Sequence, residues 1–541
     1  PGLKEYWRLL YRAEDAVTEV PETHWSPRDY YSKNPKTQDH TYCTRGGYLS
    51  AVPFNPAEFG IPPSILEATD TSQILGLVAT RMALDDAGYG KTRAFDRSRV
   101  SVMLGATVTQ ELVISQGSRL GHPKWRKALE DSGIPADKAQ EVVERISDSY
   151  PAWQESSFPG LLGNVIAGRI ANRFDFGGTN TTLDAACASS FTALNLAFME
   201  LQTGRSDMVV TGGVDTLNDI FMHMCFAQTG VLSHEGKVKA FSDSADGTVL
   251  SEGLGILILK TLDQAEKDKD KIYAVIRSVG SSSDGKSLSI YAPSAKGQAR
   301  AIRRAYDEAG IDPSTVEMVE AHGTGTRGDV VEFDGLVMAF DSENGKKNRC
   351  GIGTVKSNIG HAKATAGMAG LIKGILALYH KVLPPLINLD KLDPKINVTD
   401  SPFYFLTQSR PWMPPKNHPR RCGVTASGFG GSNFHVVLEE YGRDKPDTSW
   451  DGSVEILAFS GHSREDVLKK LTDFKASVSM ENPLFECDAF FRYQASLTRQ
   501  TFNPEEKARF LLIVTTDERP AVLVDQAIAE LTSSPAESFE K

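Results

Sequence analysis

The chain has 541 residues, of which 40% are hydrophobic and 24% are charged. This ordinary globular composition excludes collagen, a coiled coil and bulk disorder, and the formal net charge of −10 argues against a dedicated nucleic-acid binder. At roughly 100–200 residues per domain, the length predicts one large α/β unit with an accessory domain, or a few ordinary domains.

Strands and helices alternate along the chain, which predicts α/β layers. Short apolar runs predict buried strands, and longer periodic runs predict helices. In chain order, we expect a helix over 74–87, a strand over 101–105, a helix over 188–201, strands over 208–212 and 255–260, a helix over 298–309, a strand over 316–321 and a helix over 362–380.

Two internal echoes predict a pseudo-duplicated core. Residues 83–89 resemble residues 305–311, and both segments close a helix ahead of a loop and an apolar strand. Two helices also begin with small residues, at 185–190 and 362–367. Small residues let helices approach closely, so we expect both helices to be central and buried. Helix ends of the Asp-Glu-Ala-Gly kind are common, so the similarity of residues 83–89 to 305–311 can also be a coincidence.

A polar, turn-rich stretch over 439–453 predicts a domain boundary. A small separate α/β module follows it, and the polar residues near its end are typical of a linker. Its expected elements are a strand over 454–460, a helix over 463–477, a strand over 510–515 and a helix over 520–531.

Two glycine motifs match nucleotide-binding patterns. Residues 280–287 fit GxxxxGK[ST], but a phosphate loop needs a helix to begin at its lysine, and the residues up to Pro293 are extended, so we expect no ATP site. Residues 323–328 fit GxGxxG after a strand, which is a weak signal alone. The acids about 20 residues on, Asp341 and Glu343, lie in a polar loop, which argues against a dinucleotide site.

Cys187 stands where a strand-like stretch leads into a helix. The positive end of the helix dipole is expected to lower its pKa and expose a thiolate nucleophile, and small neighbours leave room for a substrate. The competing interpretation is a buried structural cysteine. The six cysteines form no Cys-x-x-Cys pair, which argues against a zinc ribbon or a disulfide framework and suits a reducing, cytoplasmic location.

His322 and His361 both stand on glycine turns before expected helices. A lone histidine is more often a satisfied hydrogen-bonding residue than a catalyst, but two such settings together with Cys187 favour a catalytic site. Phe429 lies in Gly-Phe-Gly-Gly-Ser-Asn, where glycines on both sides free the backbone to turn or move. That suits an oxyanion hole or a gate, and a plain glycine-rich loop is the alternative.

These motifs, in this order, resemble those of a β-ketoacyl synthase (ketosynthase) domain of a type I polyketide or fatty-acid synthase, most of all the polyunsaturated-fatty-acid type. The resemblance runs to about residue 440 and implies an α/β thiolase fold, a pseudo-duplicated five-layered αβαβα core with halves at about 1–260 and 261–440. Residues 441–541 resemble the small α/β linker domain between a ketosynthase and an acyltransferase. The matching segments are 184–190, 244–247, 252–255, 320–326, 356–361 and 428–433.

The resemblance implies a ping-pong condensation. Cys187 takes an acyl chain from the phosphopantetheine thioester of an acyl carrier protein, and malonyl on a carrier protein is decarboxylated to give a carbanion that attacks the acyl group. His322 and His361, as neutral imidazoles with Nε2–H donors, bind the malonyl thioester oxygen or assist decarboxylation. The backbone N–H groups of Cys187 and Phe429 hold the oxyanion on the acyl carbonyl.

The resemblance also implies supporting roles. Lys356 orients the site, unless it forms a structural salt bridge, Thr324 and Thr326 hydrogen-bond the pantetheine arm, and Phe429 gates the acyl pocket. We expect no cofactor or metal bound by this domain, no membrane span and no nucleic acid. The expected partners are acyl carrier protein, malonyl and acyl thioesters, an adjacent acyltransferase domain and a second copy in a homodimer.

The chain departs from the family pattern at two places. The family usually opens with a strand such as Ile-Ala-Ile-Val-Gly, expected to be central, whereas this chain begins at Pro1 without Met, so we expect it to start inside a longer one. Only Arg327 separates Thr326 from Gly328, so that loop is one residue short, which bears on the pantetheine contacts.

Three other classes compete with a condensing enzyme. A papain-like cysteine hydrolase also pairs Cys with His, but leaves the second His and the threonines without a role. A metal site built from Cys187, His322 and His361 lacks a close ligand pair such as HxxxH. A non-catalytic or acyl-transfer-only scaffold predicts that Cys187→Ala leaves condensation unaffected.

Overall fold

The computed structural model describes residues 2–90, 93–107, 110–286, 289–340, 347–413, 415, 417–442, 454–477, 488–515 and 520–533. The chain divides into two compact units, Pro1–Asp447 and Thr448–Lys541. Each is described by itself below, and the first holds all the candidate site residues.

The first half of the larger unit is built on one sheet with the strand order β4-β3-β5-β6. Three strands are parallel and β6 is antiparallel to β5. Because β3 is buried on both faces, its side chains alternate between two helical layers: Val102 and Leu104 pack with α3 and α8, and Met103 packs against α9. The bounds are α3 (Thr71–Asp86), β3 (Val100–Gly105), α8 (Asn164–Phe174), β4 (Asn180–Leu183), α9 (Ser189–Gln202), β5 (Met208–Asp215) and β6 (Gly253–Leu259).

The second half repeats this plan around a sheet with the order β11-β9-β8-β13-β14-β7. Tyr306 of α12 and Phe340 of α13 pack on one face of that sheet, and Met368 and Leu371 of α15 pack on the other. The bounds are β7 (Val275–Ser283), α12 (Ala295–Ala309), β8 (Met318–Glu320), α13 (Gly328–Phe340), β9 (Cys350–Gly353), α15 (Ala366–His380), β11 (Phe403–Phe405), β13 (Arg421–Gly428) and β14 (Ser432–Glu439).

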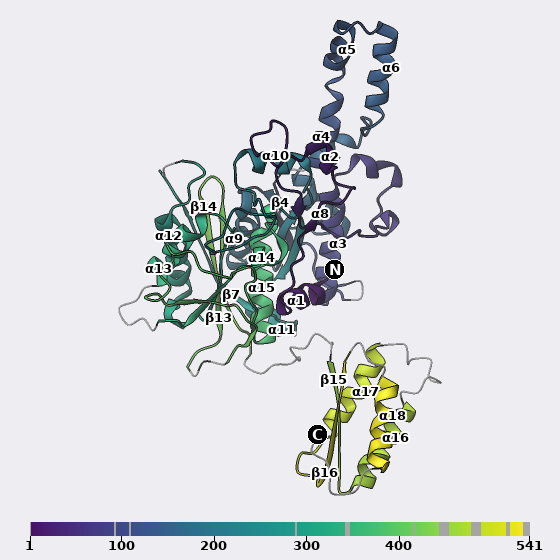
Figure 1. Ribbon diagram of the computed structural model, residues 1–541, viewed down its shortest axis with the longest axis vertical. Helices are drawn as coiled ribbons and strands as arrows, with labels where there is room; N and C mark the ends of the chain where they lie inside the picture. The colour runs from purple at the N-terminus through teal and green to yellow at the C-terminus, as the bar shows by residue number, and fades with distance from the viewer. Residues whose placement is uncertain are drawn as a thin grey trace. The chain divides into compact units, whose positions relative to one another are not determined.

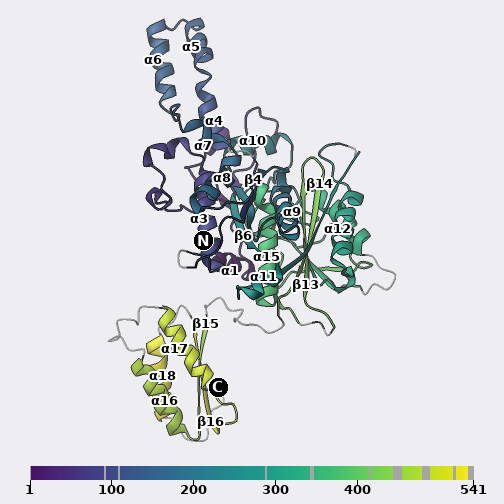
Figure 2. The ribbon, with the colours of Figure 1, turned by 180° about the vertical axis from the view of Figure 1, so that it is seen from behind.

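The two halves meet through α9 and α15, which lie between the sheets (Figures 1 and 2). A Cβ on Gly367 would stand 2.9 Å from the Phe191 ring, so the small residue permits this close approach. From side to side the layers are α3 and α8, the first sheet, α9 and α15, the second sheet, then α12 and α13. The predicted pseudo-duplicated αβαβα core is therefore confirmed.

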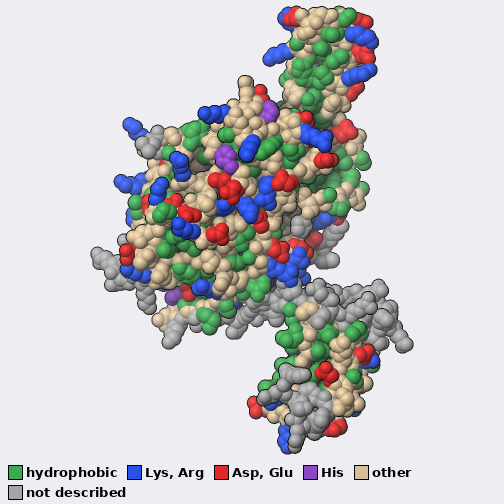
Figure 3. All heavy atoms as spheres, viewed as in Figure 1, with side chains coloured by type: hydrophobic (Ala, Val, Ile, Leu, Met, Phe, Trp, Pro, Cys, Tyr) green, Lys and Arg blue, Asp and Glu red, His purple; other side chains and the backbone are tan. Residues whose placement is uncertain are grey.

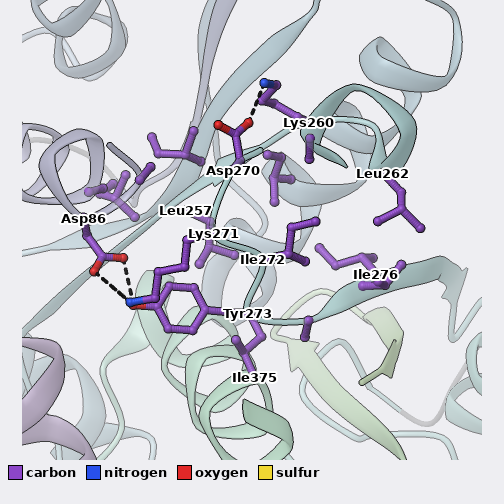
Figure 4. A pocket seen from close by; sticks show the side chains of 18 of the residues that line it. Asp86, Leu257, Lys260, Leu262, Asp270, Lys271, Ile272, Tyr273, Ile276 and Ile375 are labelled. Atoms are coloured by element: carbon purple, nitrogen blue, oxygen red, sulfur yellow. Dashed lines mark hydrogen bonds and ion pairs between the residues drawn. The ribbon is translucent and has the colours of Figure 1, made fainter. Parts of the chain in front are cut away.

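The outer edge of β6 has no strand partner among the described residues. In the second half, β7 pairs antiparallel with β14 at the matching position. A strand preceding the first helix was expected to be central, and the duplicated half places its counterpart at a sheet edge instead. A cavity of about 370 Å³ runs beside β6, lined by Leu257, Ile276 and Ile375 and bordered by the Lys260–Asp270 ion pair (Figure 4).

One prominent feature was not predicted. Helices α5 (His122–Asp131) and α6 (Ala136–Ser147) form an antiparallel hairpin that projects from the body beyond α4 (Gln110–Arg119) (Figure 1). The Arg119 guanidinium closes the base of the hairpin by donating to the carbonyl of Ser147 at 2.6 Å and that of Tyr150 at 3.0 Å.

The first unit also contains shorter or marginal elements. They are α1 (Leu3–Tyr11), β1 (Thr18–Glu19), α2 (Pro27–Tyr30), β2 (Arg45–Gly46), η1 (Pro56–Phe59), η2 (Pro63–Ala68), α7 (Ser157–Leu161), η3 (Ala186–Ala188), α10 (Ile220–Gln228), α11 (Leu262–Lys267), η4 (Pro313–Thr315), α14 (Lys356–Ile359), η5 (Lys363–Thr365), β10 (Val382–Leu383) and β12 (Arg410–Pro411).

The second unit is a two-stranded antiparallel sheet covered by helices. Strands β15 (Val454–Gly461) and β16 (Ala508–Thr515) pair antiparallel, and Leu457 and Phe459 of β15 pack against the helices. The two predicted helices are present as α16 (Arg464–Ser477) and α18 (Pro520–Ser533), whereas α17 (Asp488–Gln500) was not predicted. Residues 443–453, which hold most of the expected boundary, and Cys487 lie outside the described residues.

Candidate active site

Cys187 stands on a tight strand-to-helix elbow. Strand β4 ends at Leu183, the turn η3 follows, and α9 begins at Ser189. Ala186 takes a left-handed φ of 51°, which side chains flanking the turn hold in place. The Asp184 carboxylate accepts from the Ala186 N–H at 2.9 Å, and the Ser189 hydroxyl donates to the Ala186 carbonyl at 2.6 Å. The elbow leaves the Cys187 residue only 7% exposed.

The thiol of Cys187 does not have the lowered pKa that its place before a helix predicted. Burial raises its pKa to about 11, because the desolvation of a thiolate outweighs the neighbouring positive groups. Lys356, Lys363 and the backbone N–H of Phe429, which lies beside the sulfur, act in the opposite direction. At neutral pH the resting group is therefore a thiol, and the sulfur already faces a backbone donor.

His322 follows strand β8 and presents one ring nitrogen to the site. Its Nδ1 accepts from the backbone N–H of Ser427 at 3.4 Å and lies 3.5 Å from Nζ of Lys356. Because both neighbours are donors, Nδ1 carries the lone pair and the proton sits on Nε2. Burial holds the pKa of the ring well below its usual 6.5, with the nearby Lys356 charge adding to the effect.

His361 is fixed in the same tautomer by a different segment. Its Nδ1 accepts from the backbone N–H of Lys363 at 3.0 Å, which again leaves the proton on Nε2. Burial and the charges of Lys356 and Lys363 lower its pKa well below 6.5. The two rings stand 5.6 Å apart between centroids and nearly perpendicular. Both rings are therefore neutral Nε2–H donors at neutral pH, and their catalytic role stays a prediction.

Lys356, at the start of α14, is buried behind His322. Its ammonium donates to the His322 carbonyl, and burial lowers its pKa. Among the described residues no carboxylate lies within 4 Å of this ammonium, so the alternative of a structural salt bridge is not supported. The side chain instead ties the main chain of His322 to α14.

Glu332 and Asp329 belong to the site although the sequence did not single them out. The Glu332 carboxylate accepts from the N–H groups of His322 at 2.6 Å and Gly323 at 2.8 Å, and burial raises its pKa to about 7. Asp329 accepts from Thr324 at 2.9 Å and Gly325 at 3.0 Å. Acids in the first turns of the helix after a glycine loop were the signal that could have found them.

These carboxylates also show whether the GxGxxG loop at residues 323–328 can bind a phosphate. The N–H groups that would cradle a phosphate already donate to Asp329 and Glu332, so the loop is not a phosphate site. The hydroxyls of Thr324 and Thr326 lie 2.9 Å apart and hydrogen-bond to each other. Arg327, the single residue of the shortened segment, is exposed.

The GxxxxGK[ST] motif is likewise not a nucleotide loop. Gly280 lies inside β7, where a Cβ would stand 2.3 Å from the Ala301 carbonyl oxygen. No helix begins at Lys286, and the next described helix is α12. Asp284 instead accepts from the Asn433 amide at 2.7 Å, which joins this segment to the glycine-rich loop around Phe429.

Phe429 lies on the tight turn between β13 and β14. A Cβ on Gly428 would stand 2.3 Å from the Ala185 carbonyl oxygen, so the glycine lets this turn approach the Cys187 elbow. The Phe429 side chain is 43% exposed, with the Tyr291 ring 6.0 Å away and the Phe226 ring 6.2 Å away. The turn therefore directs its amide toward the sulfur and leaves an aromatic side chain at the surface.

Ser427 and Phe429 connect the predicted residues. The N–H of Ser427 donates to His322, and two residues later the N–H of Phe429 lies beside the Cys187 sulfur. His361 joins them through its ring contact with His322. Residues predicted from four separate motifs thus meet at the two helix starts in the centre of the unit.

Other kinds of site find little support in the described part of the chain. No group of three or more His, Cys, Asp or Glu side chains there is arranged to hold a metal ion. None of the described helices is long and apolar enough to cross a membrane. On the face shown in Figure 3, basic and acidic side chains are interspersed.

Comparisons with known proteins agree with this geometry. The family model "Beta-ketoacyl synthase, N-terminal domain" matches residues 1–265, and "Beta-ketoacyl synthase, C-terminal domain" matches residues 273–390. A polyunsaturated fatty acid synthase of Thraustochytrium sp. is 40% identical over 81% of this chain. Polyketide synthase PksN of Bacillus subtilis is 34% identical over 81% of it. The chain spans only 16% and 8% of those two proteins.

Solved structures give the same result for the fold. The ketosynthase from module 6 of the bacillaene synthase of Bacillus subtilis is 29% identical with a TM-score of 0.70, covering 98% of this chain and 83% of that one. The oxazolomycin ketosynthase domain OzmH KS7 of Streptomyces albus is 28% identical with a TM-score of 0.70, covering 98% and 85%. With two family models matched in order and the thiolase-type fold shared with solved ketosynthases, this chain belongs to the β-ketoacyl synthase family.

Proposed function

We propose that this chain catalyses the decarboxylative Claisen condensation of a Cys187-bound acyl chain with malonyl-acyl carrier protein to give a 3-oxoacyl-carrier protein, which makes it an acyltransferase. One observation carries the proposal. Backbone N–H groups hold Nδ1 of both His322 and His361, so two neutral Nε2–H donors stand beside a cysteine whose sulfur faces the Phe429 N–H. The proposed setting is fatty-acid or polyketide synthesis, of the polyunsaturated-fatty-acid type.

The first half-reaction loads the enzyme. The Cys187 sulfur attacks the acyl thioester on the carrier protein, the carbon–sulfur bond to phosphopantetheine breaks, and the thiol proton ends on the departing pantetheine sulfur. The N–H groups of Cys187 and Phe429 stabilise the oxyanion on the acyl carbonyl. Because the pKa of the Cys187 thiol is about 11, proton removal has to accompany the attack.

The second half-reaction forms the carbon–carbon bond. The malonyl thioester oxygen accepts from Nε2–H of His322 and His361, which stabilises the enolate as the carboxylate leaves as CO₂. The enolate carbon attacks the acyl-Cys187 carbonyl, the acyl–sulfur bond breaks, and the departing thiolate takes one proton from water to return to the thiol state. Neutral imidazoles suit this role because each ring donates a hydrogen bond from Nε2–H in its resting protonation state.

The remaining roles complete the proposal. Lys356 holds the His322 segment, Thr324 and Thr326 bind the pantetheine arm, and Phe429 gates the acyl pocket. The chain itself holds no cofactor, since phosphopantetheine comes with the carrier protein. A homodimer is supported by apolar side chains left at the surface around α4 and α7: Leu120 is 70% exposed and Phe158 is 69% exposed. The second unit as a linker to an acyltransferase and the cytoplasmic location stay predictions.

A cysteine hydrolase of the papain type is less well supported. Such an enzyme keeps a thiolate beside a protonated histidine, so the pKa of its cysteine is lowered. Here the pKa of Cys187 is raised, and both histidines have pKa values well below 6.5. A non-catalytic scaffold does not explain why His322 and His361 are both held as buried Nε2–H tautomers.

Mass spectrometry of the intact protein tests the proposal. After incubation with an acyl-carrier thioester, wild type and the control Cys225→Ala, whose cysteine is exposed on α10, are expected to gain one acyl group, and Cys187→Ala is expected to gain none. Malonyl-carrier protein is then expected to remove the acyl group as a 3-oxoacyl product. An adduct on Cys187→Ala, or no adduct on wild type with several chain lengths, contradicts the proposal.

A further inference from the structure

A buried ion pair lies beside the site and has no part in the proposed chemistry. Nζ of Lys363 stands 2.9 Å from Oδ1 of Asp215, and the two side chains are only 5% and 4% exposed. Asp215 ends β5 in the first half, whereas Lys363 opens η5 in the second. The ion pair therefore joins the two duplicated halves where their helix starts meet.

The pair is connected to the turn that carries His361. The Lys363 ammonium also donates to the Ser251 carbonyl at 2.7 Å, and Ser251 donates its own N–H to the His361 carbonyl at 3.0 Å. The second carboxylate oxygen of Asp215 accepts from the Ala364 N–H at 3.1 Å. Three residues of this turn, His361, Lys363 and Ala364, are thus bonded to β5 or to the segment before β6.

The same turn sets the tautomer of His361, because the backbone N–H of Lys363 is the group that holds Nδ1. Lys363 takes a left-handed φ of 44°, a conformation that side chains other than glycine adopt only when their surroundings impose it. Its side chain is anchored at both Asp215 and Ser251. The anchored side chain therefore stabilises the backbone geometry that His361 needs.

The location also places both charges near the nucleophile. A Cβ on Gly213 would stand 2.8 Å from Cα of Thr365 and 3.0 Å from Cβ of Ser190, so β5 passes directly beneath the starts of α9 and α15. Lys363 lowers the pKa of Cys187 and Asp215 raises it, as charges close to the thiol do. The pair is near neutral as a unit, so its fixed geometry is the property that matters at the site.

We propose that Asp215 and Lys363 are positioning residues: their buried ion pair fastens the His361 turn to the Cys187 half of the molecule and holds the Nε2–H of His361 in line for the malonyl thioester. This inference rests on the proposed function and deepens it. The ion pair then acts in the decarboxylation step alone. Acylation uses Cys187 and the Phe429 N–H, and neither group belongs to the turn that the pair holds.

The double variant Asp215→Asn/Lys363→Met tests the assignment. Each single change leaves one buried charge unpaired and is expected to lower stability, whereas the double variant removes both charges and is expected to recover most of that stability. Its decarboxylation of malonyl-carrier protein is expected to fall by about tenfold to a hundredfold, the usual cost of a small misplacement at a catalytic group. Its acylation by acyl-carrier protein is expected to stay within about twofold of wild type.

The Arg420–Glu440 pair provides a matched control. It is also buried, with a separation of 2.7 Å and a second ion pair from Glu440 to Lys381 at 2.8 Å, but lies at the opposite end of β13 from Ser427. Arg420→Met/Glu440→Gln is expected to change stability without changing the ratio of decarboxylation to acylation. If the double variant does not fold, Asp215→Glu gives the second measurement, because it keeps both charges but displaces the turn, and it is expected to lower that ratio to a smaller extent.

Two results overturn the inference. One is a folded double variant with the decarboxylation rate of wild type, and the other is an equal fall in both half-reactions. Failure of the proposed function is distinguishable, because wild type then shows neither an acyl adduct nor decarboxylation.

Discussion

Glu332 is the residue whose titration is expected to shape the pH profile. Its carboxylate holds the N–H groups of His322 and Gly323, and its raised pKa of about 7 places protonation near neutrality. Below that pH the neutral acid is a weaker acceptor, so the support of His322 weakens as pH falls. The two histidines contribute nothing in this range, because their pKa values lie well below 6.5 and both remain neutral.

We therefore expect decarboxylation by wild type to rise with pH through about 7. Glu332→Gln is expected to be slower at high pH and to show no inflection there, since its amide does not titrate. Initial rates of CO₂ release between pH 5.5 and 8.5, about one and a half units either side of that pKa, check this. An inflection near 7 that persists in Glu332→Gln assigns the titration to another group and contradicts the account.

Ala186 carries the backbone strain of the nucleophile elbow. At a φ of 51°, a β-branched residue is disfavoured by about 1–3 kcal/mol, while glycine is favoured. Ala186→Val is expected to lower the free energy of unfolding by that amount and to slow acylation by acyl-carrier protein. Ala186→Gly is expected to acylate at a rate close to wild type. If valine acylates as fast as glycine, the elbow geometry is not required.

At the scale of elements, the site depends on how closely strand ends approach helix starts. Strand β3 reaches α9 so closely that a Cβ on Gly105 would stand 2.3 Å from the backbone of Ser189 and Ser190. Backbone atoms cannot move aside as a flexible side chain can, so the glycine fixes the distance between strand and elbow. Ala186 in the first half and Lys363 in the second both take a left-handed φ just before a central helix, so the same backbone turn occurs once in each half.

Gly105→Ala is expected to destabilise the first unit by about 1–3 kcal/mol or more, because the added methyl group overpacks this contact. Gly117→Ala is the control: no atom lies within 4 Å of a Cβ there, and the residue is inside α4. That change is expected to stabilise the chain by up to about 1 kcal/mol. Urea unfolding measures both, and equal effects of the two substitutions contradict the contact.

Sequence reasoning predicted the elements that carry strong periodicity and failed where tertiary structure decides. The central helices and the strands β3, β5, β6 and β8 were predicted, with ends displaced by a few residues, whereas β9, β11 and β13 were not predicted. The α5–α6 hairpin was missed because Gly121, Pro123, Gly133 and Pro135 interrupt its pattern. The pKa of Cys187 was predicted in the wrong direction. The position of a cysteine before a helix can be recognised in the sequence, but the burial that desolvates its thiolate depends on the whole fold.

The candidate site shows the same division. Cys187, His322, His361 and Phe429 were found because their motifs are specific. The tautomer of His322 depends on Ser427, which lies 105 positions away in the chain. Neither that contact nor the ion pair of Asp215 with Lys363 leaves a sequence pattern. The first arises only when β13 pairs with β8 inside the second half, and the second only when the two halves pack together.

At the scale of the whole molecule, the described sheets of the two halves differ at their edges: the second has β11 beyond β9 and β7 beyond β14, whereas β4 and β6 are the edge strands of the first. Strand β6 lies beside an apolar cavity of about 370 Å³ where the second half has β7. A strand-forming apolar segment of about five or six residues, joined ahead of Leu3 by a short linker, is expected to pair antiparallel with β6. The pairing would remove an exposed edge and cover the cavity.

The extended chain is therefore expected to have a higher Tm and slower hydrogen exchange at the β6 amides. A control segment with proline at alternate positions cannot donate to the ladder and is expected to leave both unchanged. Unaltered exchange at β6 with the apolar segment contradicts the idea that this edge accepts a strand.

The central claim is that Cys187 and the two histidines perform one condensation, and a single-turnover experiment tests it most directly. Acyl-Cys187 enzyme is mixed with malonyl-carrier protein, and intact-mass spectra follow both proteins. The account predicts that each acyl group lost from the enzyme appears as one 3-oxoacyl-carrier protein with release of one CO₂, and that His361→Ala retains its acyl group. Release of the acyl group as free acid, or no change in the carrier protein, would contradict the account.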